Sequence, residues 1–299
     1  MKKRILLIGG NYFPEPTGIG KYNGEMVKWL AEEGHSCTVI TTFPYYPHWK
    51  IQHPYDKDCF WFKTERIEIG NNQFVNVIRC PHYVPGIPTG LKRMISELSF
   101  FFTAYLALLL LLFKKKYDIV ITVAPPFAIG LLGIFYSKIR GGKFLYHIQD
   151  LQVDAARDLA MIKSNFIVRG CLSIEKFIIK NADCVSTISA GMIDKVKIKC
   201  KKEVLLFPNW VDIETFYPIS RKNELKARHG FSASDKVVLY AGAIGHKQGL
   251  ETILQAAKAV EDIPYIKFAI CGSGPYKDKL IAVKNEMGLK NVHFLPLQP

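Results

Sequence analysis

The sequence lacks the motifs of several common cofactor and metal sites. None of its seven cysteines forms a CxxC pair, and no cysteine and histidine cluster has the spacing of a zinc site. No segment reads GxxxxGK[ST], and Gly18, Gly20 and Gly24 are spaced as GxGxxxG instead of the dinucleotide fingerprint GxGxxG. We therefore expect no metal, no bound cofactor and no Walker-type or NAD site.

A secretion signal is also missing. The apolar run after Lys2, Lys3 and Arg4 covers only residues 5–8 before two glycines, which is too short for a signal-peptide core. The cysteines are odd in number and scattered along the chain, which is typical of reduced thiols in a cytosolic protein. We expect a cytoplasmic protein whose first strand begins near Arg4.

Acidic residues are scarce relative to basic ones. The chain has 40 lysines and arginines against 26 aspartates and glutamates, so its formal net charge is +14. Hydrophobic residues make up 49% of the chain, which predicts a globular core. The charge favours an anionic partner, either a nucleic acid, an anionic membrane surface or a phosphorylated small molecule. The basic residues match no recognised nucleic-acid motif, so we expect no nucleic-acid partner.

Short runs rich in valine and isoleucine alternate with segments of helical period. This alternation predicts βαβ units and a parallel sheet, because continuous apolar runs are typical of strands buried on both faces. The expected strands are 4–8, 36–41, 75–79, 119–123, 143–148, 184–188, 204–207, 237–241, 266–271 and 292–295. The expected helices include 22–33, 166–181, 251–261 and 276–287. The fold class is therefore α/β.

A basic run and a polar stretch interrupt this pattern between residues 195 and 235. We expect a first Rossmann-like, doubly wound domain over 1–200, an interdomain segment over 201–235 that includes Asn209, and a second domain over 236–299. A doubly wound domain normally has about five or six strands. Only three or four are expected after the boundary, so the second domain is expected to be incomplete.

Residues 98–113 form the longest uncharged segment, with Lys92 and Arg93 before it and Lys114 to 116 after it. As a helix this segment is roughly 24 Å long, slightly less than a bilayer core of about 30 Å. A membrane span here would place the two halves of one sheet on opposite sides of the membrane. We favour a helix that packs on the sheet and also contacts an anionic membrane interface. A simple buried helix and a transmembrane span stay open as alternatives.

Two strand ends in the first domain carry candidate site residues. Gly18 and Gly20 precede a helix, where backbone N–H groups and the helix dipole favour a phosphate; alternatively, they only permit a turn. His147 and Asp150 lie at the carboxyl end of the strand 143–148, where open α/β sheets bind ligands. They are candidates to orient an acceptor hydroxyl or to take its proton. The alternative is a packed strand histidine and a helix N-cap.

The second domain carries two further glycine-rich strand ends. In the first, Gly242 and Gly245 let the backbone approach a diphosphate and Lys247 supplies a positive charge, unless this lysine is only a solvent-exposed turn residue. In the second, Gly272, Gly274 and Pro275 follow the strand 266–271 and are a weak signal alone. Glycine-rich strand ends in two α/β domains together predict a site for a nucleotide diphosphate.

The order of these motifs resembles the retaining glycosyltransferases of the GT4 family, which have the GT-B fold. The resemblance covers nearly the whole chain. It rests on FPEPTGIGKY at 13–22, PNWVDIETF at 208–216, YAGAIGHKQGLETILQAA at 240–257, GSGP at 272–275 and NVHFLP at 291–296. HIQDLQVDA at 147–155 and the KQG form are similar to the colanic-acid and O-antigen transferases of the WcaI and WbuB type.

The resemblance implies a role for each matching residue. Gly18 and Gly20 would approach the donor phosphates and the acceptor, and His147 and Asp150 would lie in the central cleft. Gly242 would open the phosphate loop of the second domain. Gly272, Gly274 and Pro275 would lie near the nucleotide base, and Asn209 in the interdomain segment.

The sequence departs from the family pattern in two places. Ala243 and Gln248 stand where the family has arginine and lysine, so Lys247 becomes the candidate phosphate ligand. The family's acidic donor motif, two glutamates eight positions apart, follows the NVHFLP strand, and this sequence ends before it. We therefore expect a C-terminally truncated donor domain.

The resemblance implies that a hexose or deoxyhexose is transferred with retention from a nucleotide-diphosphate sugar. The acceptor would be a polyprenyl-diphosphate-linked or growing polysaccharide, such as an O-antigen or capsule. The enzyme would lie at the inner face of the cytoplasmic membrane. The alternative is an inactive remnant that keeps acceptor and membrane binding.

Overall fold

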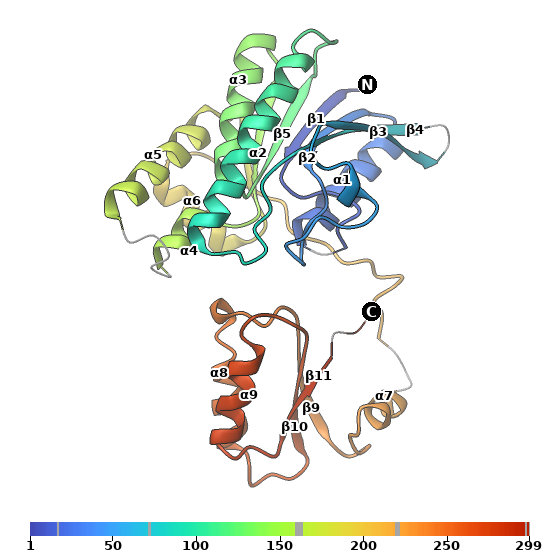
Figure 1. The fold of residues 1–299 in the computed structure, drawn as a ribbon, viewed down its shortest axis with the longest axis vertical. Helices are drawn as coiled ribbons and strands as arrows, with labels where there is room; N and C mark the ends of the chain where they lie inside the picture. The colour runs from blue at the N-terminus through green and yellow to red at the C-terminus, as the bar shows by residue number, and fades with distance from the viewer. Residues whose placement is uncertain (17, 71–72, 159–163, 219–221, 297, 299) are drawn as a thin grey trace. The chain divides into compact units, whose positions relative to one another are not determined.

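We analysed a computed structural model of the chain, which describes residues 1–16, 18–70, 73–158, 164–218, 222–296 and 298. The chain divides into two compact units, Met1–Val211 and Asp212–Pro299 (Figure 1). The boundary lies inside the segment 201–235, and the first eleven residues of that segment belong to the first unit.

The first unit is built around an eight-stranded sheet with the strand order β3-β4-β2-β1-β5-β6-β7-β8. Its strands are β1 (Arg4–Gly9), β2 (Ser36–Thr42), β3 (Lys63–Gly70), β4 (Gln73–Cys80), β5 (Ile119–Ala124), β6 (Lys143–Ile148), β7 (Cys184–Thr187) and β8 (Leu205–Leu206). All neighbouring pairs are parallel except β3 and β4, which are antiparallel.

Helices cover both faces of this sheet. They are α1 (Gly18–Glu32), α2 (Gly90–Leu111), α3 (Gly130–Arg140), α4 (Gln152–Asp158), α5 (Asn165–Asn181) and α6 (Ala190–Lys199). Side chains along a strand alternate between faces. Ile5 and Leu7 of β1 therefore pack with α1, whereas Leu6 and Ile8 pack with α2 and α3 on the opposite face. Helices α5 and α6 share a core with α3 on that second face.

The strand β3 was not expected from the sequence. Its segment KTERIEIG alternates half-buried and exposed residues, because β3 is the edge strand of the sheet. The prediction searched for continuous apolar runs, and an edge strand of alternating pattern does not produce one. The ten expected strands are all present, with ends that differ from the expectation by at most two residues.

The second unit contains the parallel sheet β11-β10-β9. Its described elements are α7 (Lys222–Arg228), β9 (Lys236–Ala241), α8 (Glu251–Ala259), β10 (Ile266–Cys271), α9 (Lys277–Glu286) and β11 (Val292–Leu295). Leu254 of α8 and Leu280 of α9 join Ile270 of β10 in one buried core. The connections of β9 to β10 and of β10 to β11 are thus two consecutive βαβ units.

Candidate functional site

The parallel strands of the first unit end at one edge of the sheet, which we call the carboxyl edge. The loops after neighbouring strands meet there. A Cβ atom at Gly10, after β1, would lie 3.1 Å from Cδ of Pro126, after β5. The first glycine loop, which leads from β1 to Gly18, therefore lies directly against the loop that follows β5.

Glu15 holds this glycine loop from inside. Its side chain is 2% exposed, and its carboxylate accepts hydrogen bonds from the backbone N–H groups of Tyr45 and Tyr46 at 2.9 Å each. The Asn11 amide donates a further hydrogen bond at 2.8 Å. Burial raises the pKa of Glu15, and the donated hydrogen bonds oppose this shift. A Cβ at Gly20 would lie 2.7 Å from Glu15 Cβ, so the packing of Glu15 requires glycine at this position.

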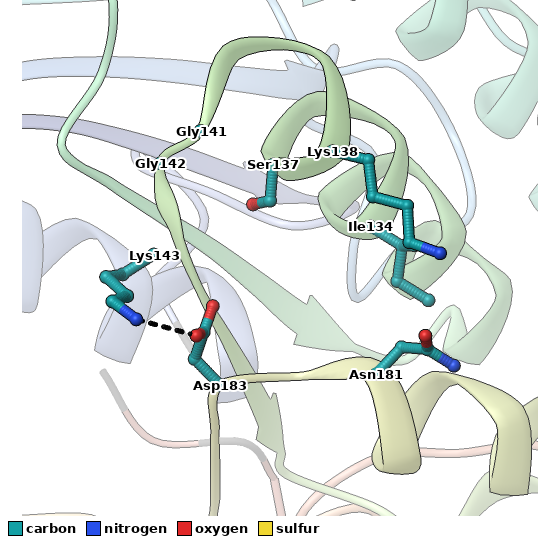
Figure 2. Close-up of a pocket in the computed structure, with 8 residues that line it drawn as sticks. All are labelled: Ile134, Ser137, Lys138, Gly141, Gly142, Lys143, Asn181 and Asp183. Carbon is teal, nitrogen blue, oxygen red and sulfur yellow. Dashed lines mark hydrogen bonds and ion pairs between the residues drawn. The ribbon is translucent and has the colours of Figure 1, made fainter.

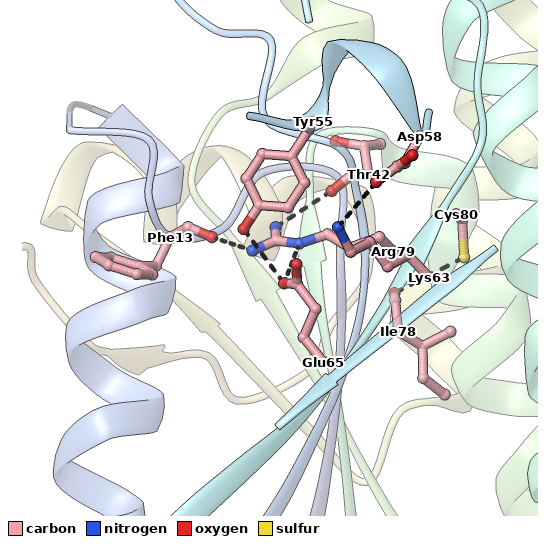
Figure 3. A network of polar contacts seen from close by, with 9 residues as sticks. All are labelled: Phe13, Thr42, Tyr55, Asp58, Lys63, Glu65, Ile78, Arg79 and Cys80. Carbon is pink, nitrogen blue, oxygen red and sulfur yellow. Dashed lines mark hydrogen bonds and ion pairs between the residues drawn. The ribbon is translucent and has the colours of Figure 1, made fainter. Parts of the chain in front are cut away.

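Arg79 ties the same loop to the sheet (Figure 3). This fully buried guanidinium donates to the carbonyl of Phe13 at 2.7 Å, to the carbonyl of Thr42 at 3.4 Å and to Glu65 Oε2 at 3.0 Å. The Tyr55 ring lies beside it, with 5.1 Å between the ring centroid and Arg79 Cζ. Arg79 therefore fixes the glycine loop, the end of β2 and the strand β3 relative to one another.

The sequence analysis missed both Glu15 and Arg79. The available signal was a charged residue inside otherwise apolar segments: Arg79 interrupts the run of β4, and Glu15 lies in the FPEP motif. Buried charges are rare unless they are paired or hydrogen-bonded. These two side chains position the loop that leads to Gly18 and Gly20 at the start of α1.

His147 lies near the end of β6 and is 3% exposed. Its Nδ1 is 2.9 Å from Ser186 Oγ on the neighbouring strand β7, and either atom can be the donor. Burial lowers the pKa of His147 from 6.5 to about 4, because the interior disfavours the charged ring. His147 is therefore a neutral imidazole near pH 7. Asp150 is exposed in the following loop, and no hydrogen bond joins it to His147 in the described part of the chain.

An aromatic chain links His147 to the helix that follows the glycine loop. The Phe207 ring is 5.4 Å from the His147 ring and 5.9 Å from the Trp210 ring. Trp210 in turn contacts Tyr22 of α1 at 5.2 Å between centroids, and its Nε1 donates to Glu25 Oε2 at 2.6 Å. The structure thus brings the segment around Asn209, which is itself exposed, next to both α1 and β6.

In the second unit, the candidate glycines bring two strand-end loops into backbone contact. Gly242 N–H donates to the carbonyl of Cys271 at 3.0 Å. A Cβ at Gly272 would lie 1.9 Å from the Gly242 carbonyl oxygen, and a Cβ at Gly274 would lie 2.2 Å from that of Ile244. Gly272 and Gly274 also have φ values of +148° and +157°. These glycines are required by loop packing, whether or not a ligand binds there.

We expect Gly272→Ala to destabilise the second unit by about 3 kcal/mol or more, since it combines an unfavourable φ with a backbone collision. Gly288→Ala is the matched control, because Gly288 also has a positive φ of +68° but a Cβ there meets nothing within 4 Å. Chemical unfolding followed by circular dichroism measures the difference. Equal losses in the two variants would contradict the collision.

Gly245 and Gln248 form the turn before α8. A Cβ at Gly245 would lie 2.7 Å from Gln248 Oε1, and this buried oxygen has no hydrogen-bond partner among the described residues. An unpaired buried acceptor is costly and leaves this turn able to accept a hydrogen bond from a ligand or water. Lys247 lies in the same turn, and its side chain is outside the described part of the structure. Pro275 is exposed just before α9.

Neither a metal-ligand group nor the pocket of Figure 2 marks the carboxyl edge in the described part of the chain. Within the described residues, no group of three or more histidine, cysteine, aspartate or glutamate side chains is placed to hold a metal ion. The pocket shown in Figure 2 has a volume of about 260 Å³ and lies where α3 ends and β6 begins. It is therefore at the opposite edge of the sheet from His147.

Two family patterns match this chain. The glycosyl transferase 4-like domain matches residues 17–210, and the glycosyl transferases group 1 pattern matches residues 221–299. The chain belongs to the glycosyl transferase 4-like family. It is also 37% identical over 302 residues to the putative colanic acid biosynthesis glycosyl transferase WcaI of Escherichia coli strain K12, covering 99% of this chain and 72% of that relative. The resemblance to GT4 glycosyltransferases of the WcaI type is thus confirmed.

Solved glycosyltransferase structures share the fold. Sucrose-phosphate synthase from Thermosynechococcus elongatus matches with a TM-score of 0.70 at 20% identity, over 99% of this chain and 71% of that one. HepE from Anabaena in complex with UDP and glucose matches with a TM-score of 0.61 at 15% identity, over 99% of this chain and 70% of that one. The expected α/β fold of the GT-B class is therefore confirmed.

Proposed function

We propose that this glycosyltransferase transfers a hexose or deoxyhexose from a nucleotide-diphosphate sugar to a lipid-linked or growing polysaccharide acceptor, with retention. The observation that carries the proposal is the family match over both units, combined with glycine-lined strand ends in each unit. HepE, which shares the fold, is solved in complex with UDP and glucose, and WcaI is a putative glycosyl transferase of colanic acid biosynthesis. Both facts support this donor and acceptor class.

In the proposed reaction, the bond from the anomeric carbon to the leaving diphosphate breaks and a bond to the acceptor oxygen forms on the same face. The nucleoside diphosphate leaves with the electron pair of the broken bond, and the proton of the acceptor hydroxyl passes to the His147 imidazole or the Asp150 carboxylate. His147 and Asp150 serve the acceptor side, where a neutral imidazole can accept a hydrogen bond from a hydroxyl. Gly18 and Gly20 open α1, whose N-terminus favours the phosphates.

On the donor side of the proposal, the second unit binds the nucleotide diphosphate. Gly242 and Gly245 expose backbone to the diphosphate, and Lys247 supplies a positive charge. Gly272, Gly274 and Pro275 precede α9 and contact the base. Charge that develops on the leaving diphosphate is stabilised by these fixed donors.

We also propose that the enzyme binds an anionic membrane, at the inner face of the cytoplasmic membrane, through α2. This helix has 22 residues and is long and apolar enough to cross a membrane by length and composition, and 33% of its most apolar stretch is buried against the rest of the protein. One side packs on the sheet, whereas the other exposes a continuous apolar stripe. The stripe consists of Leu91, Ile95, Leu98, Phe102, Leu106, Leu110 and, just beyond the helix, Phe113. An apolar stripe with basic residues at its ends is the pattern of an interfacial helix.

The test incubates the chain with UDP- and GDP-sugars and a polyprenyl-diphosphate-linked acceptor glycan. We expect a glycosylated lipid whose new linkage keeps the anomeric configuration of the donor, read by NMR of the product. An inverted linkage would contradict retention. A titration with no affinity for any nucleotide sugar, together with intact acceptor binding, would instead favour the remnant that only binds acceptor and membrane.

A further inference from the structure

The helices on the two faces of the eight-stranded sheet end in residues of opposite charge. Helices α2, α3, α5 and α6 cover one face and α1 covers the other (Figure 1). Because crossover helices run antiparallel to the strands they connect, these helices all end at the edge opposite the carboxyl edge. We call this the amino edge.

The four-helix face carries a group of cations at the amino edge. They are Lys114, Lys115 and Lys116 after α2, Lys138 and Arg140 in α3, Lys180 in α5, and Lys197 and Lys199 in α6. On the other face, α1 ends in Glu32 and is followed by Glu33, and the Lys2 side chain lies beside Gly34. The helix dipole favours cations at every helix C-terminus, so it does not account for this difference. The positive charge follows the face of the sheet.

Two arginine side chains hold the segment after α2 against α3 and β1. Arg140 Nη2 donates to the Lys114 carbonyl at 2.9 Å, and Arg4 donates to the carbonyls of Lys115 and Lys116 at 3.2 and 3.1 Å. The pocket in Figure 2 lies at the same edge and is lined by Lys138 and also by Lys143, whose Nζ is 3.0 Å from Asp183 Oδ1.

A larger pocket, of about 580 Å³, lies between the ends of α5 and α6. It is lined by Lys176, Lys180, Ile198, Lys199, Cys200, Lys201 and Lys202. Two of these lysines already have internal partners: Lys199 pairs with Asp154 and Glu175, and Lys202 donates to the carbonyl of Ala182. In the part of the chain that the structure describes, Lys176, Lys180 and Lys201 form no ion pair. Their charges remain available to a ligand.

Exposed apolar side chains lie in the pocket wall and beside the pocket lysines of α5. Ile198 in the pocket wall is 86% exposed, and Ile174 and Phe177 are exposed in the half of α5 that carries Lys176 and Lys180. Apolar side chains beside uncompensated lysines fit a bilayer surface, where the apolar groups enter the acyl boundary and the lysines meet phosphates. A site for duplex nucleic acid would need the lysines but would gain little from the exposed Ile198 side chain in the pocket wall.

We propose that the pocket between α5 and α6 binds the phosphate-bearing headgroup of an anionic lipid. It forms a second membrane contact beside the α2 stripe, so the four-helix face lies toward the bilayer and α1 lies toward water. This inference rests on the proposed membrane association, and it adds a site and an orientation that α2 alone does not provide.

The test measures cosedimentation of the full chain with equimolar phosphatidylcholine and phosphatidylglycerol vesicles. We expect the triple variant Lys176→Gln, Lys180→Gln, Lys201→Gln to bind on the order of 100-fold more weakly, since each lysine near an anionic surface contributes to the attraction. The control variant Lys279→Gln, Lys284→Gln, Lys290→Gln changes the net charge equally but lies in the second unit, so its binding should be nearly unchanged. Circular dichroism melts show that both variants are folded.

The outcomes separate this proposal from the broader one. If Phe102→Ser, Leu106→Ser weakens vesicle binding and the pocket variant does not, α2 binds the membrane and the pocket proposal is wrong. If the wild-type chain does not bind the vesicles, the proposed membrane association itself fails. If the pocket variant loses affinity for a short DNA duplex but not for vesicles, the pocket is a nucleic-acid site and the lipid proposal is overturned.

Discussion

His147→Ala is expected to lower kcat by about 10²–10⁴-fold while KM changes little, because a positioned acid–base group contributes on this scale. The ring is held by Ser186 and Phe207, so its orientation does not depend on a bound substrate. The matched control is His82→Ala. His82 is a second histidine with buried ring nitrogens, whose pKa burial lowers to about 3, but neither nitrogen has a partner among the described residues. Loss of the His82 ring should change the stability of the protein and leave kcat within a few-fold of the wild-type value.

The pH profile tests the same role independently. The pKa of His147 is about 4 in the folded chain, compared with an ordinary histidine pKa of 6.5. The neutral ring, which can accept a hydrogen bond, therefore persists at pH values well below 6.5. The acid limb of kcat/KM should therefore lie near pH 4. Stability also falls as the pH drops from 6.5 toward 4, since the unfolded chain takes up the proton first. The folded fraction must be measured alongside the rate. An acid limb near 6.5, or a His147→Ala variant of normal kcat, would remove His147 from the mechanism.

Strand positions were the most predictable part of the fold. Strands such as β6 and β10 are short and mostly apolar, which is the pattern of parallel strands buried on both faces. The edge strand β3 was not predicted, because only one of its faces is packed and its charged residues interrupt the apolar run. Helix ends were less predictable: α1 begins at Gly18 instead of Tyr22, because two glycines at its start suggest a loop by propensity.

The position of the candidate site in the fold was predictable from the sequence, but its side-chain contacts were not. Strand ends of a parallel sheet meet at one edge, which is why His147 and the first glycine loop fall on the same side of the first unit. Long-range partners cannot be read from spacing. Arg79 reaches Phe13 across 66 positions, and Trp210 reaches Glu25 across 185. The glycines of the second unit were expected to serve a ligand. Glycine is already required at position 272 because a Cβ there would collide with the Gly242 carbonyl oxygen.

Arg79→Met is expected to lower the unfolding free energy of the first unit by about 3–5 kcal/mol, because it leaves the Glu65 carboxylate and two carbonyls without their buried donor. For a unit of this size, that loss corresponds to a fall in Tm of roughly 6–20 °C. The matched control is Lys63→Met on the neighbouring strand β3. Lys63 also pairs with a carboxylate, Asp58 at 3.4 Å, but both side chains are well exposed, so this change should cost less than about 1 kcal/mol.

The same variant separates stability from loop positioning. Arg79 donates to the Phe13 carbonyl of the glycine loop, and its Cζ lies 5.9 Å from the centroid of the Tyr12 ring in the same loop. At a temperature where Arg79→Met is fully folded, the loop therefore loses these contacts while the hydrogen bonds of Glu15 remain. We then expect KM for the nucleotide sugar to rise, whereas Lys63→Met keeps the wild-type value. Normal KM in folded Arg79→Met would show that Glu15 alone positions the loop and that Arg79 acts only on stability.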